Sequence, residues 1–253
     1  MNKSKVASKR VRPLLGTFVE VSLFTEGDFN EAVSKTFELA QSLEQIFNLH
    51  DPNSEISQLN ARVDDDTFEI SASLAEVIER AEQITELSEG AFNPWREGSD
   101  YWDLNGIAKG YIVDKMVEYL LQQNSSLSGV INAGGDLRFF NSSEKSVTLR
   151  LGSFDEPVVR EISLVKNAIA TSSPSISVQD EKSSTTYSKS LREGLNSTHS
   201  VSVMANECMI ADALTKVGLF GNLETIQKCA SAFKAQIIIF DDKGQPLDVI
   251  GEP

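Results

Sequence analysis

The sequence predicts an α+β fold, a single compact unit of mixed sheets with packed helices. Short segments in which apolar and polar side chains alternate, the pattern of strands, are interspersed with longer segments in which apolar residues recur every three to four positions, the pattern of amphipathic helices. No repeat or domain linker interrupts the chain. We therefore expect one domain from residue 13 to residue 253, preceded by a flexible N-terminus at residues 1–12.

Seven strands are expected. The first follows Arg12 and Pro13, has Gly16 at its entrance, and alternates through Val19 and Val21. The last is a short apolar run, which is typical of a buried final strand. The expected strands cover residues 15–24, 128–132, 137–140, 147–151, 158–164, 201–205 and 236–240.

Five amphipathic helices are expected between these strands. Apolar residues recur at helical spacing in each of them, and Gly90 ends the second helix with the residue best suited to a left-handed cap. Residues 172–198 are rich in Ser, Thr and charged groups, which predicts an exposed loop region of low order. The expected helices cover residues 30–49, 73–87, 106–122, 209–220 and 223–233.

Charge and cysteine content exclude several classes of protein. The 253 residues include 23 Lys and Arg against 37 Asp and Glu, a formal net charge of −14, which argues against binding to nucleic acid. Two cysteines, Cys208 and Cys229, are too few for a Cys-rich zinc site or a disulfide framework, so both are expected in the core.

Hydrophobic runs are short throughout the chain. The run from Val19 to Phe24 is interrupted by Glu20, so it does not make the hydrophobic region of a secretory signal. No run approaches the roughly 20 apolar residues of a membrane-spanning helix. The sequence therefore predicts a cytoplasmic protein without a membrane span.

Glycines at a helix entrance make the segment 103–111 a candidate phosphate site. Unpaired amides and the dipole at a helix N-terminus favour an anion, and Lys109 adds a positive charge there. The segment has neither Walker A spacing nor a GxGxxG pattern, and a glycine at a helix entrance is common. Only two histidines, His50 and His199, occur, so a site with several histidine ligands is excluded.

Two further segments carry acidic side chains in suggestive places. The turn NAGGD at 132–136 follows a strand, where two glycines allow positive φ or close approach to a flat ligand, although an ordinary hairpin fits equally. Asp212 lies in an apolar stretch of a helix, where a buried carboxylate needs a partner such as a metal ion or Lys216. A surface ion pair between Asp212 and Lys216 fits the spacing as well.

Six short motifs follow one another along the chain, namely LGTFV at 15–19, DPNSEISQLN at 51–60, SEGAFNP at 88–94, GIAKGYIVD at 106–114, NAGGD at 132–136 and ADAL at 211–214. Together they resemble the ApbE-type flavin transferases, and the resemblance covers roughly residues 12–221. The resemblance implies an enzyme that takes FAD and magnesium, moves the FMN half onto a Ser or Thr hydroxyl of an acceptor flavoprotein, and releases AMP.

The resemblance also implies which residues bind FAD. Adenine and flavin are expected among Leu15, His50, Ala91, Phe92 and Asn93, and the phosphates near Lys109 and Lys115. The expected FAD-binding residues are Leu15, His50, Ala91, Phe92, Asn93, Lys109, Lys115, Asp136 and Lys189.

By the same resemblance, magnesium is expected on the main-chain carbonyl of Ile112 and on Asp212, which is also expected to act in catalysis. The family places a threonine four residues after this aspartate, where the present chain has Lys216. Thr215 is displaced from that position by about 100° around the helix. The candidate metal residues are therefore Ile112, Asp212, Thr215 and Lys216, and an ammonium that replaces part of the metal's charge is one of two outcomes left open.

A second departure concerns the histidine thought to activate the acceptor hydroxyl, because Tyr187 takes its place. An unperturbed phenol titrates near pH 10, so Tyr187 would be a poor base unless a cation such as Lys189 lowered its pKa. Two alternatives to FMN transfer stay open. One is an FAD-binding protein without catalysis, and the other is a magnesium-dependent FAD pyrophosphatase in which water replaces the acceptor hydroxyl.

Overall fold

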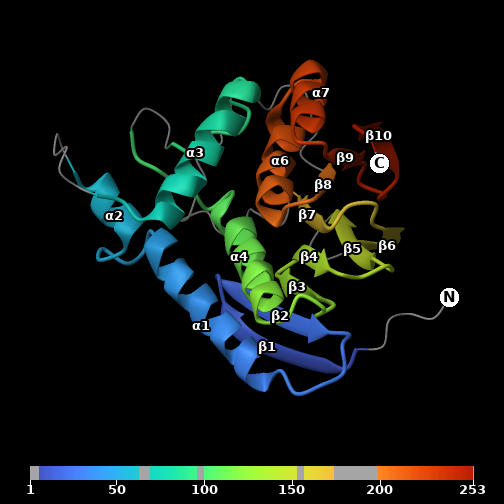
Figure 1. Ribbon diagram of the computed structural model, residues 1–253. Coiled ribbons are helices and arrows are strands. Elements are labelled where there is room, and N and C mark those ends of the chain that lie inside the picture. The colour runs from blue at the N-terminus through green and yellow to red at the C-terminus, as the bar shows by residue number, and fades with distance from the viewer. Residues whose placement is uncertain (1–5, 63–68, 96–99, 153–156, 174–198, 253) are drawn as a thin grey trace.

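The computed structural model describes residues 6–62, 69–95, 100–152, 157–173 and 199–252 (Figure 1). Within them, one sheet of eight strands has the order β1-β2-β3-β4-β7-β8-β9-β10, and β5 and β6 form a separate hairpin. Every pairing in the two sheets is antiparallel. The strands are β1 Ser8–Leu14, β2 Thr17–Leu23, β3 Gly129–Ala133, β4 Asp136–Phe140, β5 Ser146–Gly152, β6 Pro157–Ser163, β7 Ala168–Ser172, β8 Ser200–Ala205, β9 Gln236–Phe240 and β10 Pro246–Ile250.

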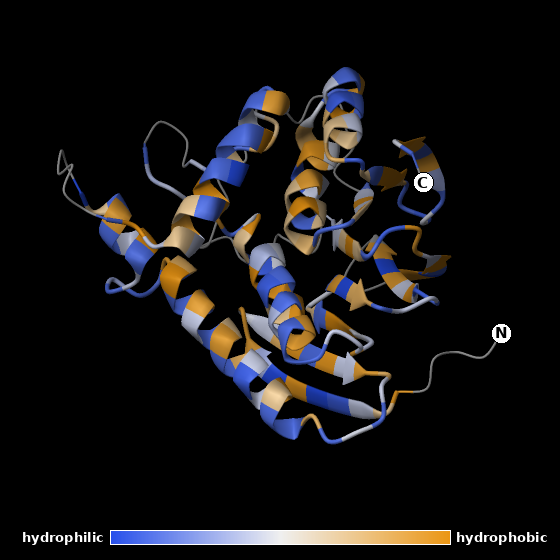
Figure 2. Ribbon diagram, viewed as in Figure 1, coloured by the Kyte–Doolittle hydropathy of each residue, from blue (hydrophilic) through white to orange (hydrophobic). Residues whose placement is uncertain are grey.

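Helices cover one face of the large sheet. Val203 and Ile237 face the main core with helices α4 and α6, whereas Met204 and Phe240 join a smaller cluster with the β5–β6 hairpin. Figure 2 shows α6 largely in hydrophobic colours, in keeping with its position between α4 and the strands β7 and β8. The helices are α1 Asn30–Phe47, α2 Glu55–Asn60, α3 Ala72–Leu87, α4 Ala108–Gln123, α6 Cys208–Phe220 and α7 Leu223–Ala232.

The α+β class is confirmed, and the helices and strands expected from periodicity are all present within two residues at each end. Cys208 and Cys229 are buried, as expected. None of the helices in the described ranges is both long and apolar enough to cross a membrane. The expected loop region at 172–198 falls outside the described residues except for Ser172 and Ser173.

The prediction of a flexible N-terminus is wrong for residues 8–12, which belong to β1 and pair with β2. Leu15 and Gly16, expected inside the first strand, instead form the two-residue turn between β1 and β2, with φ of 58° and 67°. The sequence of β1 lacks the apolar alternation of a strand because arginines occupy the positions that pack over α1. Arg10 Nη1 donates to Ser34 Oγ at 2.8 Å, and the Arg12 guanidinium lies over a phenyl ring of that helix.

Three other elements were not expected from the sequence. β9 is not the final strand, because β10 pairs with it at the edge of the sheet and is exposed along most of its length, so no apolar pattern marks it. β7 has only five residues. α2 is a short helix capped by Ser54, whose Oγ accepts from the amide of Ser57 at 3.1 Å.

The helices α4 and α6 approach each other most closely at Gly110. A side chain at this position would collide with the main-chain atoms of Cys208 and Met209 at the start of α6, so only glycine allows this approach. Asp114, one turn further along α4, accepts from the amides of Cys208 at 2.8 Å and Met209 at 2.9 Å. It also pairs with Arg138 of β4 at 2.7 Å. Asp114 therefore caps α6 from a different helix and fixes where α6 begins.

We predict that the stability difference between the wild type and Asp114→Asn depends on pH. Burial raises the pKa of Asp114 to about 6, against a usual value of 3.8. Between these values the folded state holds a proton that the unfolded state has released, so acidification stabilises the folded wild type through this group. The free energy of unfolding of the wild type, relative to the variant, should increase by about 1 kcal/mol from about pH 7.5 to about pH 5.5. Urea titrations at both pH values measure it, and a constant or decreasing difference would contradict the assignment.

Candidate functional site

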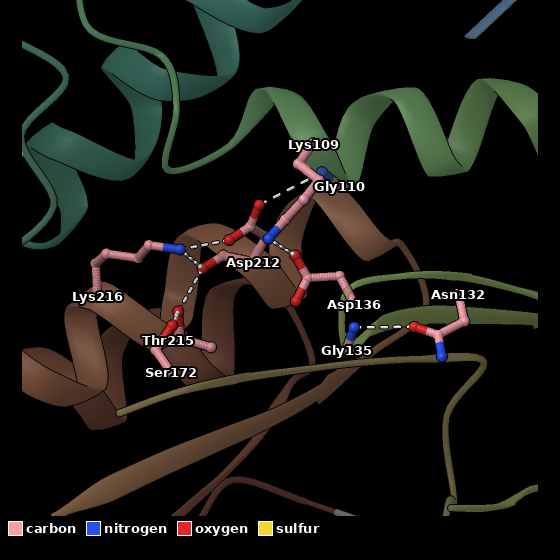
Figure 3. A network of polar contacts seen from close by, with 9 residues as sticks. All are labelled: Lys109, Gly110, Asn132, Gly135, Asp136, Ser172, Asp212, Thr215 and Lys216. Carbon is pink, nitrogen blue, oxygen red and sulfur yellow. Dashed lines mark hydrogen bonds and ion pairs between the residues drawn. The ribbon is translucent and has the colours of Figure 1, made fainter. Parts of the chain in front are cut away.

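Four charged side chains from three elements meet where α4 begins and packs against α6 (Figure 3). Lys109 of α4 pairs with Asp136, the first residue of β4, with 2.9 Å between Nζ and Oδ2. Lys216 of α6 pairs with Asp212 Oδ1 one turn earlier in the same helix, and its Nζ also donates to the Asp212 main-chain carbonyl at 3.0 Å. The amide of Gly110 lies 3.4 Å from Asp212 Oδ2 and connects α4 to this second pair.

The two acids and the two bases of this charge cluster differ in exposure. The side chains of Asp136 and Asp212 are 6% and 3% exposed, whereas those of Lys109 and Lys216 are 33% and 14% exposed. The carboxylates are therefore the more buried members of the two pairs, and the lysine side chains are the more exposed members.

Electrostatics keep Lys109 protonated. The neighbouring carboxylate of Asp136 holds the pKa of Lys109 well above its usual value, and Asp212 adds to the effect. Burial raises the pKa of Asp136, although the Lys109 ammonium opposes this shift. Lys109 thus carries a full charge at neutral pH and can donate to a phosphate oxygen.

A tight turn delivers Asp136 to the cluster. Gly134 and Gly135 have φ of 62° and 110°, and the amide of Gly135 donates to Asn132 Oδ1 at 2.9 Å. A side chain on Gly134 would press against Thr17 of β2. Both glycines of this motif are therefore explained by the hairpin turn between β3 and β4.

The side chains expected to hold magnesium make hydrogen bonds and ion pairs within the protein. Lys216 occupies Asp212 Oδ1 and the Asp212 carbonyl, and the Gly110 amide faces Oδ2. Thr215 Oγ1 donates to the same carbonyl at 2.7 Å and shares a hydrogen bond with Ser172 Oγ at 2.8 Å. Ile112 lies inside α4, where a helical carbonyl accepts from the amide four residues later. Among the described residues, no group of three or more His, Cys, Asp or Glu is placed to hold a metal.

Lys115, expected near the phosphates, lies elsewhere on α4. Its Nζ is 3.2 Å from Glu76 and 3.2 Å from Glu118, and it lies over the ring of Tyr111. It lines a cavity of about 370 Å³ formed by residues of α1, α3 and α4. Lys115 therefore belongs to a different surface from Lys109, although both were expected to bind the same ligand.

The other expected FAD-binding residues lie in turns and loops. The amide of Leu15 donates to Glu44 Oε1 at 2.6 Å, and His50 is exposed just beyond α1. Ala91 and Phe92 are buried after α3, and Asn93 Oδ1 accepts from the amide of Trp95 at 2.9 Å. Tyr187 and Lys189 lie outside the described residues, so their roles stay predictions.

Two residues that hold elements of the site in place, Asp114 and Ser172, were not singled out from the sequence. Asp114 is part of the motif GIAKGYIVD and, four residues after Gly110, shares its face of α4, but its partners lie on α6 and β4. Ser172, which holds Thr215, belongs to the strand that periodicity did not predict. The sequence does carry a signal for Asp114, because an acidic residue lies there among apolar neighbours and on the same helix face as Gly110.

Comparisons with known proteins agree on one family. A sequence model described as the ApbE family matches residues 15–100 and 96–239. No curated protein is similar enough in sequence to be identified as a relative.

Solved structures share the fold at low sequence identity. A flavin transferase ApbE from Vibrio cholerae is 19% identical with a TM-score of 0.74, and the match covers 97% of each chain. The ApbE protein of Thermotoga maritima is 18% identical with a TM-score of 0.73, over 94% of this chain and 96% of that one. The flavinyl transferase ApbE from Pseudomonas stutzeri is 17% identical with a TM-score of 0.72, over 98% and 94%.

We predict that Asp136→Asn increases the reactivity of Lys109 toward an amine reagent. The carboxylate is the largest cause of the raised pKa of Lys109, so its removal lowers that pKa and increases the neutral, nucleophilic fraction. Competitive acetylation at mildly alkaline pH, followed by mass spectrometry, measures the ratio of labelling at Lys109 to that at Lys115. Lys115 serves as the internal reference because its partners are Glu76 and Glu118. A ratio equal to that of the wild type would show that Asp136 does not control Lys109.

Proposed function

Because the chain belongs to the ApbE family, we propose that it is a flavin transferase that takes FAD as its substrate and moves FMN to an acceptor protein. The acceptor group is the hydroxyl of a serine or threonine, and AMP is released. The observation that carries the proposal is the charge cluster of Lys109, Asp136, Asp212 and Lys216, in which the lysine side chains are more exposed than the carboxylates. Two solved structures with the same fold are those of a flavin transferase and a flavinyl transferase, which adds support.

The pyrophosphate of FAD fits the chemistry of this cluster. Ammonium groups are strong hydrogen-bond donors to phosphate oxygens, and Lys109 and Lys216 are already held in place by buried carboxylates. The N-terminus of the 16-residue helix α4, where Lys109 lies, adds the positive end of a helix dipole. The site therefore needs little rearrangement to receive a dianionic ligand, which is the main requirement for electrostatic catalysis.

The transfer is an in-line displacement at phosphorus. The acceptor hydroxyl oxygen forms a bond to the FMN-side phosphorus while the bond from that phosphorus to the bridging oxygen breaks, and the bridging oxygen leaves with AMP. The hydroxyl proton passes to a base, for which Tyr187 remains the residue predicted from the sequence. Lys109 and Lys216 offset the negative charge that develops on the phosphate oxygens. Asp136 and Asp212 act as positioning residues because they hold these two ammonium groups.

One structural observation favours a second candidate, an FAD-binding protein without transferase activity. The position where the family is expected to hold a metal ion is filled by the Lys216 ammonium, which cannot bridge several phosphate oxygens as a divalent ion does. The same substrate site would then bind FAD and leave it intact.

Incubation with FAD and an acceptor flavoprotein domain tests the proposal. Transfer predicts a mass increase of the acceptor equal to FMN less water, with one AMP released for each FMN attached. Free FMN and AMP with an unchanged acceptor mean hydrolysis, and bound but intact FAD means binding alone. Either of these two results would contradict the proposed transfer.

A matched pair of lysine variants tests where the substrate binds. Lys109→Ala removes a charge-assisted hydrogen bond to the pyrophosphate, so the dissociation constant of FAD should rise by about tenfold or more. Lys115→Ala removes the same charge from the same helix outside the charge cluster, so FAD affinity should change by less than about twofold. Flavin fluorescence titrations measure both constants. Equal effects of the two substitutions would show that FAD does not contact the charge cluster.

A further inference from the structure

We infer that Lys216 is a built-in cation at the substrate site, so that this chain binds the FAD pyrophosphate without a divalent metal ion. The inference rests on the proposed function, since it concerns how the same site holds the same substrate. It follows from the contacts of Asp212, the side chain on which a metal ion would depend.

Every oxygen of Asp212 already has a partner. Lys216 Nζ contacts both Oδ1 and the main-chain carbonyl, so one ammonium bridges the two oxygens that face it. The carbonyl also accepts from Thr215 Oγ1 at 2.7 Å, and Oδ2 faces the Gly110 amide at 3.4 Å. A magnesium ion prefers about six oxygen ligands in octahedral geometry, and here it would have to displace the ammonium to reach Oδ1 or the carbonyl.

The exchange of ammonium for metal is electrostatically unfavourable in this setting. The Asp212 side chain is 3% exposed, and removal of its cation would leave a buried charge unpaired until the metal arrived. A metal ion beside Asp212 would also repel Lys216, whose Nζ is tethered one helical turn away, and Lys109, which interacts electrostatically with Asp212. The hydroxyl of Thr215, which could otherwise serve as a further metal ligand, is hydrogen-bonded to Ser172.

Lys216 retains the capacity to hold a ligand. An ammonium has three N–H donors, and two of them are used by the oxygens of Asp212, which leaves one for a phosphate oxygen. At 14% exposure, the side chain is reached by solvent, in contrast to the carboxylate beneath it. Lys109 and Lys216 together supply two positive charges at the site, the same formal charge as one magnesium ion.

Substitutions at residue 216 should convert a site that uses an ammonium into one that uses a metal ion. Lys216→Thr removes the ammonium, frees Oδ1 of Asp212 and adds a hydroxyl one helical turn from it, so it should create a magnesium requirement. Lys216→Ala frees the same oxygen without adding a ligand, which makes it the matched control. Lys216→Arg keeps a cation and should retain metal independence.

The test is a flavin fluorescence titration of the full chain with FAD, in excess chelator and in millimolar magnesium. We expect the dissociation constant of the wild type to agree within about twofold between the two conditions. Lys216→Thr should bind FAD about tenfold more weakly in chelator and recover on addition of magnesium, and Lys216→Ala should recover less. Calorimetric titration of magnesium into protein without FAD should give heat of binding for Lys216→Thr and none for the wild type.

The outcomes separate the inference from the function on which it rests. A wild type that binds FAD tightly only with magnesium overturns the built-in cation and leaves the proposed substrate intact. A wild type that does not bind FAD in either condition overturns the proposed substrate itself. If Lys216→Thr does not fold, as judged by circular dichroism, the comparison of the wild type in chelator and in magnesium still decides between these results.

Discussion

The close approach of α4 to α6 at Gly110 is the constraint on which the rest of the site depends. Without a side chain at this position, α4 reaches the main chain of Cys208 and Met209, and Asp114 can then cap α6 through the amides of these two residues. The cap fixes the start and the rotation of α6, and thereby the place of Asp212 one turn later. Arg138 extends the same interaction to β4, the strand that begins with Asp136. One helix contact thus sets the positions of both carboxylates of the charge cluster.

Each buried carboxylate in the described part of the chain is paired with a nearby cation. Asp136 has Lys109, Asp212 has Lys216 and Asp114 has Arg138. Pairs of this kind contribute little net stability, because the removal of two charges from water offsets most of their attraction. Their value is geometric, since each buried carboxylate holds a more exposed cation in one position. For a substrate with two phosphate groups, that means donors that are in place before the ligand arrives.

The sequence predicted the helices best because each buries one apolar face, and the residues of that face repeat at helical spacing. β1 was not predicted because its arginines pack over α1, which places charge where a strand pattern would show apolar residues. β10 was not predicted because it is an edge strand exposed along most of its length, so its residues show no apolar pattern. The pair of Asp212 and Lys216 was one of two interpretations of a four-residue spacing, and the structure shows the pair with its carboxylate buried. The cap by Asp114 could not be predicted, since it joins residues more than ninety positions apart.

A crystal structure of the protein with FAD bound, grown in the presence of magnesium, tests the central claim most directly. The account predicts the pyrophosphate at the junction of α4 and α6, with its oxygens within hydrogen-bond distance of Lys109 and Lys216 and with Lys216 still on Asp212. A metal ion between Asp212 and the phosphates, with Lys216 displaced, would contradict the built-in cation. A pyrophosphate bound in the cavity beside Lys115 would contradict the assignment of the site itself.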